Sequence, residues 1–437
     1  MSLSDSIRAA GVVGAGGAGF PAHVKAAARV DTVVANGAEC EPLIHKDVEL
    51  IQRHAREIVD GVKLLMASTQ AGKGIIGLKE KNTKALQAVR AAVDDPRISV
   101  FPLGDFYPSG DEYVLVFEAT GRLIPPGGIP LDVGVVVNNV ETLYNITRAA
   151  RGTPVTEKMV TVAGAVREPV SFFAPVGMSF QDAIAVAGGT SVKDVAVIAG
   201  GLMMGTLQRD LGGPITKTCA GLIVLPLDHH LVQRKGTPEQ SMHRIGKSAC
   251  DQCSYCTELC PRYVLGYDVQ PHKVMRSLGF TTTGEEFWNQ YASLCCACGL
   301  CTLYACPESL FPKEACDRSK LAMKKSGVEW SGRREVIPHP MYEGRRTPLR
   351  QLMKRLGVVQ YDASAHFRTV SPDVSRVVIP LAQHIGSPAT PVVRAGERVH
   401  VGQVIGEIPE RTLGARIHSS IEGVVTRCDQ EVVIEKA

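Results

Sequence analysis

The stretch VVGAGGAGFP (Val12–Pro21) decides how the first part of this chain is interpreted. Its glycines Gly14, Gly16 and Gly19 have the G-x-G-x-x-G spacing that opens many dinucleotide-binding folds. Such a fingerprint follows a strand, opens a helix and precedes, by about 20 residues, an acidic residue for the ribose. Here the preceding strand is short and Asp31 comes too early. The motif alone therefore predicts a loop whose backbone can approach a phosphate or a flat ring, and it leaves the ligand open.

The composition excludes several classes of protein. The chain has 437 residues, of which 45% are hydrophobic and 21% charged, so it can bury several cores. Its formal net charge of +4 comes from abundant charges of both signs with no long basic run, which argues against nucleic-acid binding. The N-terminus lacks the apolar core of a signal peptide, and no window reaches the ~18 apolar residues of a membrane span. We expect a cytoplasmic protein that is not an integral membrane protein.

The texture of the sequence changes several times and predicts a multidomain α/β and α+β fold. Residues 1–150 alternate apolar β-type runs with amphipathic helical stretches, as in a Rossmann-like domain. Residues 155–230 have short β runs broken by Gly and Pro around one helix, as in a β-grasp domain. The segment 326–369 contains a stretch rich in Gly, Pro and Arg and is interpreted as a linker or a surface-wrapping loop, and residues 370–437 predict a small β barrel or sandwich.

The cysteines give the strongest signal. Nine of the thirteen lie between Cys250 and Cys306 of a large chain, which favours metal binding over disulfides. A first run has the C-x2-C-x2-C-x3-C-P spacing of a bacterial [4Fe-4S] ferredoxin, and a second run follows with one extra residue in its last gap. The first run comprises Cys250, Cys253, Cys256 and Cys260; the second comprises Cys295, Cys298, Cys301 and Cys306. We therefore predict a ferredoxin-like helical domain with two clusters over residues 240–325.

In two-cluster ferredoxins the fourth cysteine of each run ligates the other cluster, so Cys306 would complete the first cluster and Cys260 the second. Cys296 offers a thiol next to Cys295, and the sequence leaves open which of the two is the ligand. Zinc is the alternative metal, although zinc sites seldom use triple C-x2-C-x2-C runs. Two clusters would carry electrons one at a time, so the protein would need an electron donor and an electron acceptor.

Four motifs in the first 150 residues carry a family resemblance. GAGGAGFPAHVK (Gly14–Lys25) resembles the flavin-binding loop of the flavoprotein subunit of respiratory complex I and of the RnfC protein of the Rnf electron-transfer complex. NGAECEP from Asn36, YPSGDE from Tyr107 and VNNVETL from Val137 match the same family in the same order. The resemblance implies that the loop binds FMN and that NADH docks on the flavin.

The resemblance also assigns residues to the cofactor. Those implied to hold FMN are Gly14, Gly16, Gly17, Lys25, Asn36, Glu39, Tyr107, Gly110, Asp111, Glu112, Asn138, Asn139 and Thr142. Phe20 would stack near the NADH, and Phe20 and Glu112 are the implied catalytic residues. The chain departs from the family in two places: Ala15 replaces the usual Arg, and the aromatics that sandwich adenine have no equivalents around Ala28 or Gly128.

The flanking segments extend the resemblance over nearly the whole chain. The second segment is similar to the SLBB β-grasp domain of this family, and the C-terminal segment resembles the barrel-sandwich domain of RnfC. That domain is N-terminal in RnfC and C-terminal here, an order that resembles the corrinoid reductases of propanediol-utilization microcompartments. The resemblance implies an NADH-dependent reductase that passes electrons from FMN through two [4Fe-4S] clusters to cobalamin for diol-dehydratase metabolism.

Partners and location follow from the same resemblance. The acceptor would be cobalamin or a corrinoid adenosyltransferase, and the protein would lie within a bacterial microcompartment with shell or enzyme partners there. The motif D-x-H-x-x-G of base-off cobalamin binding is absent from the sequence, so the mode of cobalamin binding is left open. The alternative hypothesis is an electron-relay component of an Rnf-like complex that does not oxidise NADH itself.

Overall fold

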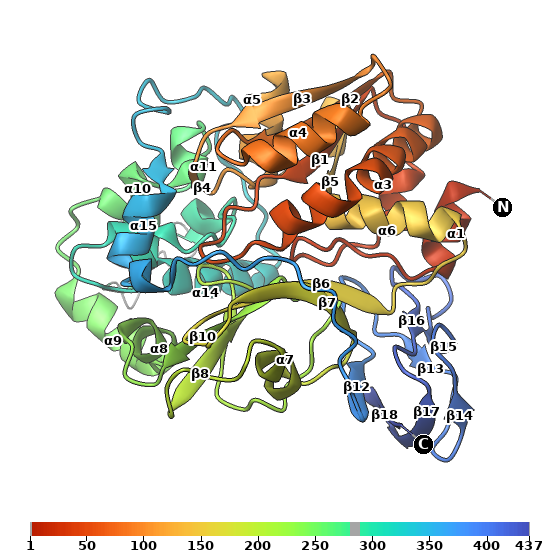
Figure 1. The fold of residues 1–437 in the computed structure, drawn as a ribbon. Helices are drawn as coiled ribbons and strands as arrows, with labels where there is room; N and C mark the ends of the chain where they lie inside the picture. The colour runs from red at the N-terminus through yellow and green to blue at the C-terminus, as the bar shows by residue number, and fades with distance from the viewer. Residues whose placement is uncertain (1, 280–288, 437) are drawn as a thin grey trace.

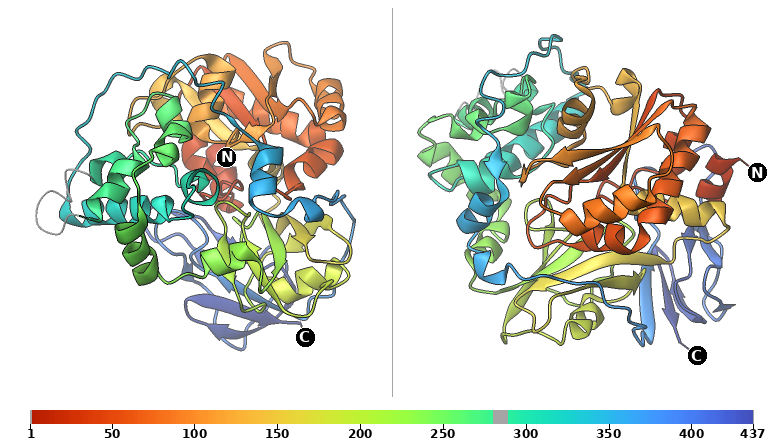
Figure 2. Two further views of the ribbon diagram at one scale, coloured as in Figure 1. Left: turned by 90° about the vertical axis from the view of Figure 1, so that its left-hand side faces the viewer. Right: turned by 45° about the horizontal axis from the view of Figure 1, so that its top comes forward.

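The computed structural model describes residues 2–279 and 289–436. Figure 1 and Figure 2 show four parts: an α/β domain, a mainly antiparallel sheet beneath it, a helical region to one side and a small β domain at the C-terminus. Residues 280–288 fall within the predicted two-cluster domain, so that part of the prediction lies outside the described residues.

The first domain is built on a parallel sheet with strand order β3-β2-β1-β5. Its strands are near-continuous apolar runs because helices cover both faces, which is typical of parallel sheets. The strands are β1 (Thr32–Gly37), β2 (Lys73–Lys79), β3 (Ile98–Leu103) and β5 (Val135–Asn139). The helices are α1 (Leu3–Ala9), α2 (Ala22–Ala26), α3 (Lys46–Thr69), α4 (Thr83–Ala92), α5 (Glu112–Thr120) and α6 (Val140–Ala150), with a 3-10 turn η1 (Pro130–Val133) and the short strand β4 (Phe106–Tyr107).

Helices α5 and α6 begin shortly after the strands β4 and β5. The side chain of Asp111 caps α5 by accepting from the amides of Tyr113 and Val114, and the side chain of Asn139 caps α6 by accepting from the amide of Glu141. Short polar side chains are favoured at this position because they satisfy amides that have no partner within the helix. Both capping residues belong to motifs predicted for the flavin, so these motifs serve the fold as well.

The second domain is a five-stranded sheet of order β7-β6-β10-β8-β9, with β6 and β10 parallel and its other pairs antiparallel. One helix packs on it, as predicted for a β-grasp domain. The elements are β6 (Glu157–Gly164), β7 (Val170–Pro175), α7 (Phe180–Val186), β8 (Val195–Ala199), β9 (Thr206–Gln208) and β10 (Gly221–Pro226).

The cysteine runs lie on short helices and the loops between them. The described elements of this region are α8 (His230–Lys235), α9 (Glu239–Ala249), α10 (Tyr255–Glu258), α11 (Pro261–Val264), α12 (Pro271–Ser277), η2 (Gln290–Ala292), the π-helical turn η3 (Cys301–Ala305) and α14 (Pro312–Ser326). Pro261 and Pro312 stand in the first turn of α11 and α14, where their missing N–H costs nothing.

The segment predicted as a linker contains regular structure. It forms β11 (Thr347–Pro348), α15 (Leu349–Arg355) and the 3-10 turn η4 (Val359–Tyr361). β11 pairs antiparallel with β4, and α15 packs against η3 of the cysteine region. The segment therefore fastens the first domain to the cysteine region. A Gly- and Pro-rich composition does not reveal this, because such short elements are specified by tertiary contacts.

The C-terminal domain consists of two small sheets, β12-β18-β17-β14 and β13-β15-β16. Its strands are β12 (Arg376–Pro380), β13 (Thr390–Pro391), β14 (Arg398–Val399), β15 (Val404–Glu407), β16 (Ile417–His418), β17 (Gly423–Cys428) and β18 (Glu431–Glu435). Val377 and Ile379 share one apolar core with Val160 and Phe172 of the second domain. The two β domains therefore pack as one body below the parallel sheet (Figure 1).

Candidate functional site

The carboxyl edge of the parallel sheet gathers the asparagines predicted for the flavin. Asn36 and Asn139 are register partners at the ends of β1 and β5, and Asn138 lies one position earlier, beside Ala35. Ligands of open α/β sheets bind at this edge, where loops leave the strands.

The glycine loop lies against the same edge. A Cβ on Gly16 would stand 3.4 Å from the Cβ of Asn139, so the loop backbone packs closely on β5. Gly17 has φ +112° and open space around it. The amide of Ala15 donates to the Oγ1 of buried Thr142 at 2.9 Å. Thr142 thus anchors the loop, while Gly17 leaves a stretch of backbone open to a ligand.

Phe20 and Lys25 continue this surface. The amide of Gly14 donates to the carbonyl of Phe20 at 2.9 Å, which closes the loop. The Nζ of Lys25 donates to the carbonyl of Val137 at 2.8 Å and lies 3.3 Å from the Oε1 of Glu112. The structure therefore brings the predicted catalytic pair close together, because the same ammonium lies 5.9 Å from the centre of the Phe20 ring.

Two buried polar groups at this edge have no protein partner. The Nδ2 of Asn36 donates to the carbonyl of Gly110 at 2.9 Å, which ties two of the motifs together. In contrast, the Nδ2 of Asn138 and the Oγ of Ser109 have no hydrogen-bond partner within the described residues. Buried polar atoms are rarely left unpaired, so these two suit a bound molecule that offers acceptors. The glycine backbone, the Lys25 ammonium and these donors fit a phosphorylated flavin.

Glu39, assigned to FMN by the resemblance, binds the start of α3. Its carboxylate accepts from the amides of Asp47 at 2.7 Å and Val48 at 3.1 Å, in the first turn of α3. Burial raises the pKa of Glu39 to about 7, with repulsion from Asp47 adding to it. The side chain of Asn139 donates to the Oδ2 of Asp47 at 2.7 Å. Glu39 therefore reaches the edge of the sheet through Asp47 and Asn139.

A buried charge network continues from Asp47 into the second domain. The Nζ of Lys46 lies 2.5 Å from Asp47 and 2.9 Å from Glu141, and Glu141 also pairs with Lys158 of β6. Glu141 accepts from the amide of Met159 at 2.9 Å as well. Burial lowers the pKa of Lys158 to about 8 against the opposing attraction of Glu141. The network holds the edge of the sheet to the β-grasp domain.

Tyr107 and Asp111 face the cysteine region. The hydroxyl of Tyr107 donates to the carbonyl of Cys298 at 2.8 Å, and Tyr107 is 2% exposed. The Oδ2 of Asp111 accepts from the Nη2 of Arg262 at 2.8 Å, and the guanidinium of Arg262 lies 3.4 Å from the centre of the Tyr113 ring. The YPSGDE motif therefore joins the edge of the sheet to the cysteine loops.

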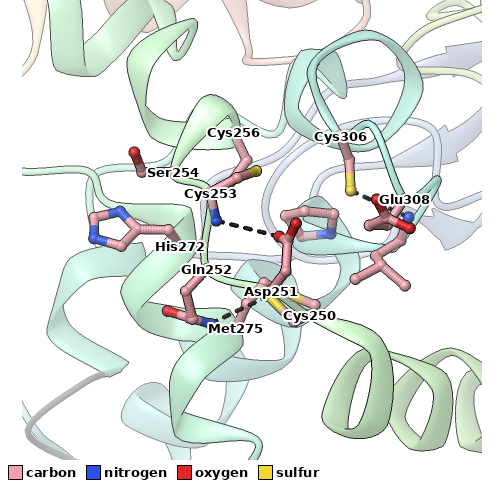
Figure 3. A pocket seen from close by; sticks show the side chains of 12 residues that line it. Cys250, Asp251, Gln252, Cys253, Ser254, Cys256, His272, Met275, Cys306 and Glu308 are labelled. Carbon is pink, nitrogen blue, oxygen red and sulfur yellow. Dashed lines mark hydrogen bonds between the residues drawn. The ribbon is translucent and has the colours of Figure 1, made fainter.

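The cysteines form two sets that exchange their fourth members. The outer set consists of Cys250, Cys253, Cys256 and Cys306, which line one small pocket (Figure 3). Cys253 is exposed. Burial raises the pKa of Cys256 to about 12, and the thiols of Cys306, Cys250 and Cys253 raise it further. The last cysteine of the second run thus joins the first three of the first run.

The inner set consists of Cys260, Cys295, Cys298 and Cys301. Burial raises the pKa of Cys260, and the thiols of Cys295 and Cys296 add to this. Burial likewise raises the pKa of Cys301, and the thiols of Cys295 and Cys260 add to this. Each set supplies four thiols, the donor type that [4Fe-4S] clusters require. Within residues 2–279 and 289–436, no three His, Cys, Asp or Glu side chains stand close enough together to hold a single metal ion.

Some residues at this site carry no sequence signal of their own. Cys316, which lies outside both cysteine runs, is buried beside Cys295 and lowers the pKa of Cys295 to about 7. Cys296 hydrogen-bonds to Cys298. Asp47 lies in the first turn of α3, and Arg262 lies two residues after Cys260. Charged residues are common at both kinds of position, so only the contacts in the folded chain identify these two as parts of the site.

Among the helices of residues 2–279 and 289–436, none combines the length and the apolar character needed to cross a bilayer.

Four family models match successive parts of the chain. They are the Nuo51 FMN-binding domain at residues 7–148, the SLBB domain at 159–207, the 4Fe-4S dicluster domain at 249–311 and the RnfC barrel sandwich hybrid domain at 365–437. The predicted multidomain fold class is confirmed.

Known proteins resemble the chain to different extents. It is 40% identical to the cobalamin reductase PduS of Salmonella typhimurium over 99% of this chain and 97% of that one. It is 36% identical to a component of the proton-translocating ferredoxin:NAD(+) oxidoreductase complex of Clostridium ljungdahlii, over 59% of this chain and 55% of that one. Among solved structures, it is similar to an NAD+-reducing [NiFe]-hydrogenase in the H2-reduced state, with a TM-score of 0.47 and 20% identity, covering 77% of this chain and 63% of that one.

The identity to cobalamin reductase PduS extends over nearly all of both chains, and the FMN-binding and 4Fe-4S models match where the structure places the sheet edge and the two cysteine sets. The predicted resemblance to corrinoid reductases is therefore confirmed: the chain belongs to the cobalamin reductase family and is an oxidoreductase with FMN-binding and 4Fe-4S domains.

Proposed function

We propose that the protein takes electrons from NADH at an FMN held on the sheet edge and delivers them singly, through two [4Fe-4S] clusters, to cobalamin. The observation that carries this proposal is the hydrogen bond from Tyr107 to the carbonyl of Cys298, which places a cysteine loop directly against a flavin motif. The name of the relatives supports cobalamin as the acceptor.

The chain's own residues divide the work at the flavin. The glycine loop, with Gly14, Gly16 and Gly17, would receive the phosphate-bearing end on its backbone amides, and Asn138 would supply its free amide donor. Lys25, fixed by Val137 and Glu112, would supply a positive charge.

Phe20 would offer a flat face to the nicotinamide. Bound FMN accepts a hydride as two electrons and releases them one at a time, which is what an NADH-to-cobalt reaction needs. Tyr107 and Asp111 would act by keeping the cysteine loops in place beside the site.

The two cysteine sets would hold the clusters. The outer set and the inner set each supply four thiols, which bind a [4Fe-4S] cluster as thiolates. The protein would reduce cobalamin in the cytoplasm, inside a microcompartment and next to a corrinoid adenosyltransferase.

An anaerobic NADH titration tests it. Protein loaded with FMN and iron is titrated with NADH while flavin and cluster absorbance are followed, and cob(II)alamin is then added. We expect NADH to bleach the flavin and the electrons to pass to cobalt. The second candidate, a relay fed by another protein, is favoured by Ala15 in the place of the family's usual Arg. It predicts a bound flavin that NADH leaves oxidised while a reduced carrier protein bleaches it.

A further inference from the structure

The two cysteine sets lie in different surroundings. Cys260 of the inner set packs in an apolar cluster with Tyr113 and Val114 of the first domain, and Cys298 packs in another with Tyr107. Cys306 of the outer set instead packs with Met275, within the helical region.

Exposure differs at one position. Cys253 of the outer set is exposed, as is its neighbour Tyr255, whereas no cysteine of the inner set is exposed. Cys256 and Cys306 of the outer set, at 8%, are nearly as buried as Cys298 and Cys301 of the inner set, at 7%. The inner set thus lies against the first domain, and the outer set reaches solvent through Cys253.

The polar links to the first domain also end at the inner set. Tyr107 donates to the carbonyl of the ligand residue Cys298 at 2.8 Å. Arg262 stands two residues after Cys260, is 8% exposed, and pairs with Asp111 at 2.8 Å. A half-buried arginine touches the loops of both sets: Arg234 donates to the carbonyls of Ser309 and Leu310, after Cys306, and to the carbonyl of Thr302, next to Cys301.

We infer that electrons leave the flavin for the inner set first and reach the acceptor from the outer set, with Arg262 as the positioning residue that fixes the inner set to the flavin site. This inference rests on the proposed function. The step is the transfer of one electron: the reduced flavin is oxidised, the cluster of the inner set is reduced, and no covalent bond is made or broken.

Arg262 also brings a buried positive charge to the inner set. Such a charge favours the reduced, more negative state of a neighbouring cluster, and outer residues of this kind tune cluster potentials. Replacing the charge should therefore lower the reduction potential of the inner cluster and leave the outer cluster unchanged.

The test is a redox titration of the loaded protein followed by electron paramagnetic resonance. Cys253→Ser removes an outer ligand, so the signal that survives in this variant is assigned to the inner cluster. We expect Arg262→Gln to shift the surviving signal to lower potential, Arg262→Lys to restore most of the shift, and neither variant to move the signal that Cys253→Ser removes. In rapid-freeze samples reduced by NADH, the inner signal should appear before the outer one, and more slowly in Arg262→Gln.

Several outcomes overturn the inference. A shift of the outer signal in Arg262→Gln, or no shift in protein with wild-type FMN and iron content, refutes the role of Arg262, and an outer signal that appears before the inner one refutes the order of the sets. Wild-type protein that binds no FMN or forms no cluster refutes the proposed function instead, and the inference with it. If Arg262→Gln does not fold, Tyr107→Phe decides, because it removes only the hydroxyl beside Cys298; a wild-type potential for the inner signal in that variant counts against the inference.

Discussion

Asn138→Leu should stabilise the flavin-free protein and weaken FMN binding at the same time. The Nδ2 of Asn138 is buried on β5 without a partner in the described residues. An unsatisfied buried donor costs about 1–3 kcal/mol, and leucine has the same branching without the polar atoms. Since about 1 kcal/mol shifts the melting temperature of a domain of this size by about 2–4 °C, flavin-free protein should melt several degrees higher.

The effect on FMN has the opposite sign. If Asn138 donates to bound FMN, losing that bond costs about 1.5–3 kcal/mol for a charged acceptor, which corresponds to an increase in Kd of about 10- to 100-fold. Fluorescence titration of flavin-free protein with FMN gives the Kd, and thermal unfolding of the same samples gives the stability. The reasoning is refuted if the variant binds FMN as tightly as wild type, or if its flavin-free form melts lower.

Asn36→Leu is the matched control at the same edge. Asn36 donates to the carbonyl of Gly110 at 2.9 Å and accepts from the amide of Ala38 at 3.2 Å. The same substitution there leaves two backbone groups unpaired, so it should lower the melting temperature of the flavin-free protein. Opposite signs for the two asparagines would separate a ligand donor from a structural one.

Three further predictions concern the charge network, the domain junction and the cysteines. Glu141→Gln leaves Lys46 and Lys158 without their shared carboxylate and should cost about 3–5 kcal/mol, of which Glu141→Gln/Lys158→Met recovers a large part; thermal unfolding of both variants checks this. Burial lowers the pKa of Lys217, which donates to the carbonyls of Gly11 and Arg416, to about 7. A lowered lysine pKa means that the unfolded chain binds the proton more readily, so wild type should gain stability relative to Lys217→Met as pH rises from about 7 toward about 10, and parallel pH profiles of the melting temperature would contradict this. Cys253→Ser should reduce the iron content from about eight to about four atoms per chain, whereas Cys428→Ser, far from both sets in the sequence, should leave it unchanged.

The sequence predicted the architecture well because its signals are local. Alternating strands and helices, the spacing of the cysteines and the order of the four motifs each lie within short stretches, and the family models confirm the fold class they indicate. The individual contacts at the site depend on long-range packing. Glu39 was assigned to the flavin by resemblance, yet its carboxylate accepts from the amides of α3. Arg262 gave no signal, because its partner Asp111 lies 151 positions away in the chain.

The strap formed by β11 and α15 imposes an order on assembly. Its strand pairs with β4 beside Tyr107, and just before it the hydroxyl of Tyr342 and the side chain of Arg346 both bind Glu118 of α5, at 2.7 Å and 2.5 Å. A ribosome must therefore translate past residue 348 before the YPSGDE motif gains its final neighbours. Until then the first domain and the cysteine region lack the contacts that this segment makes with both of them.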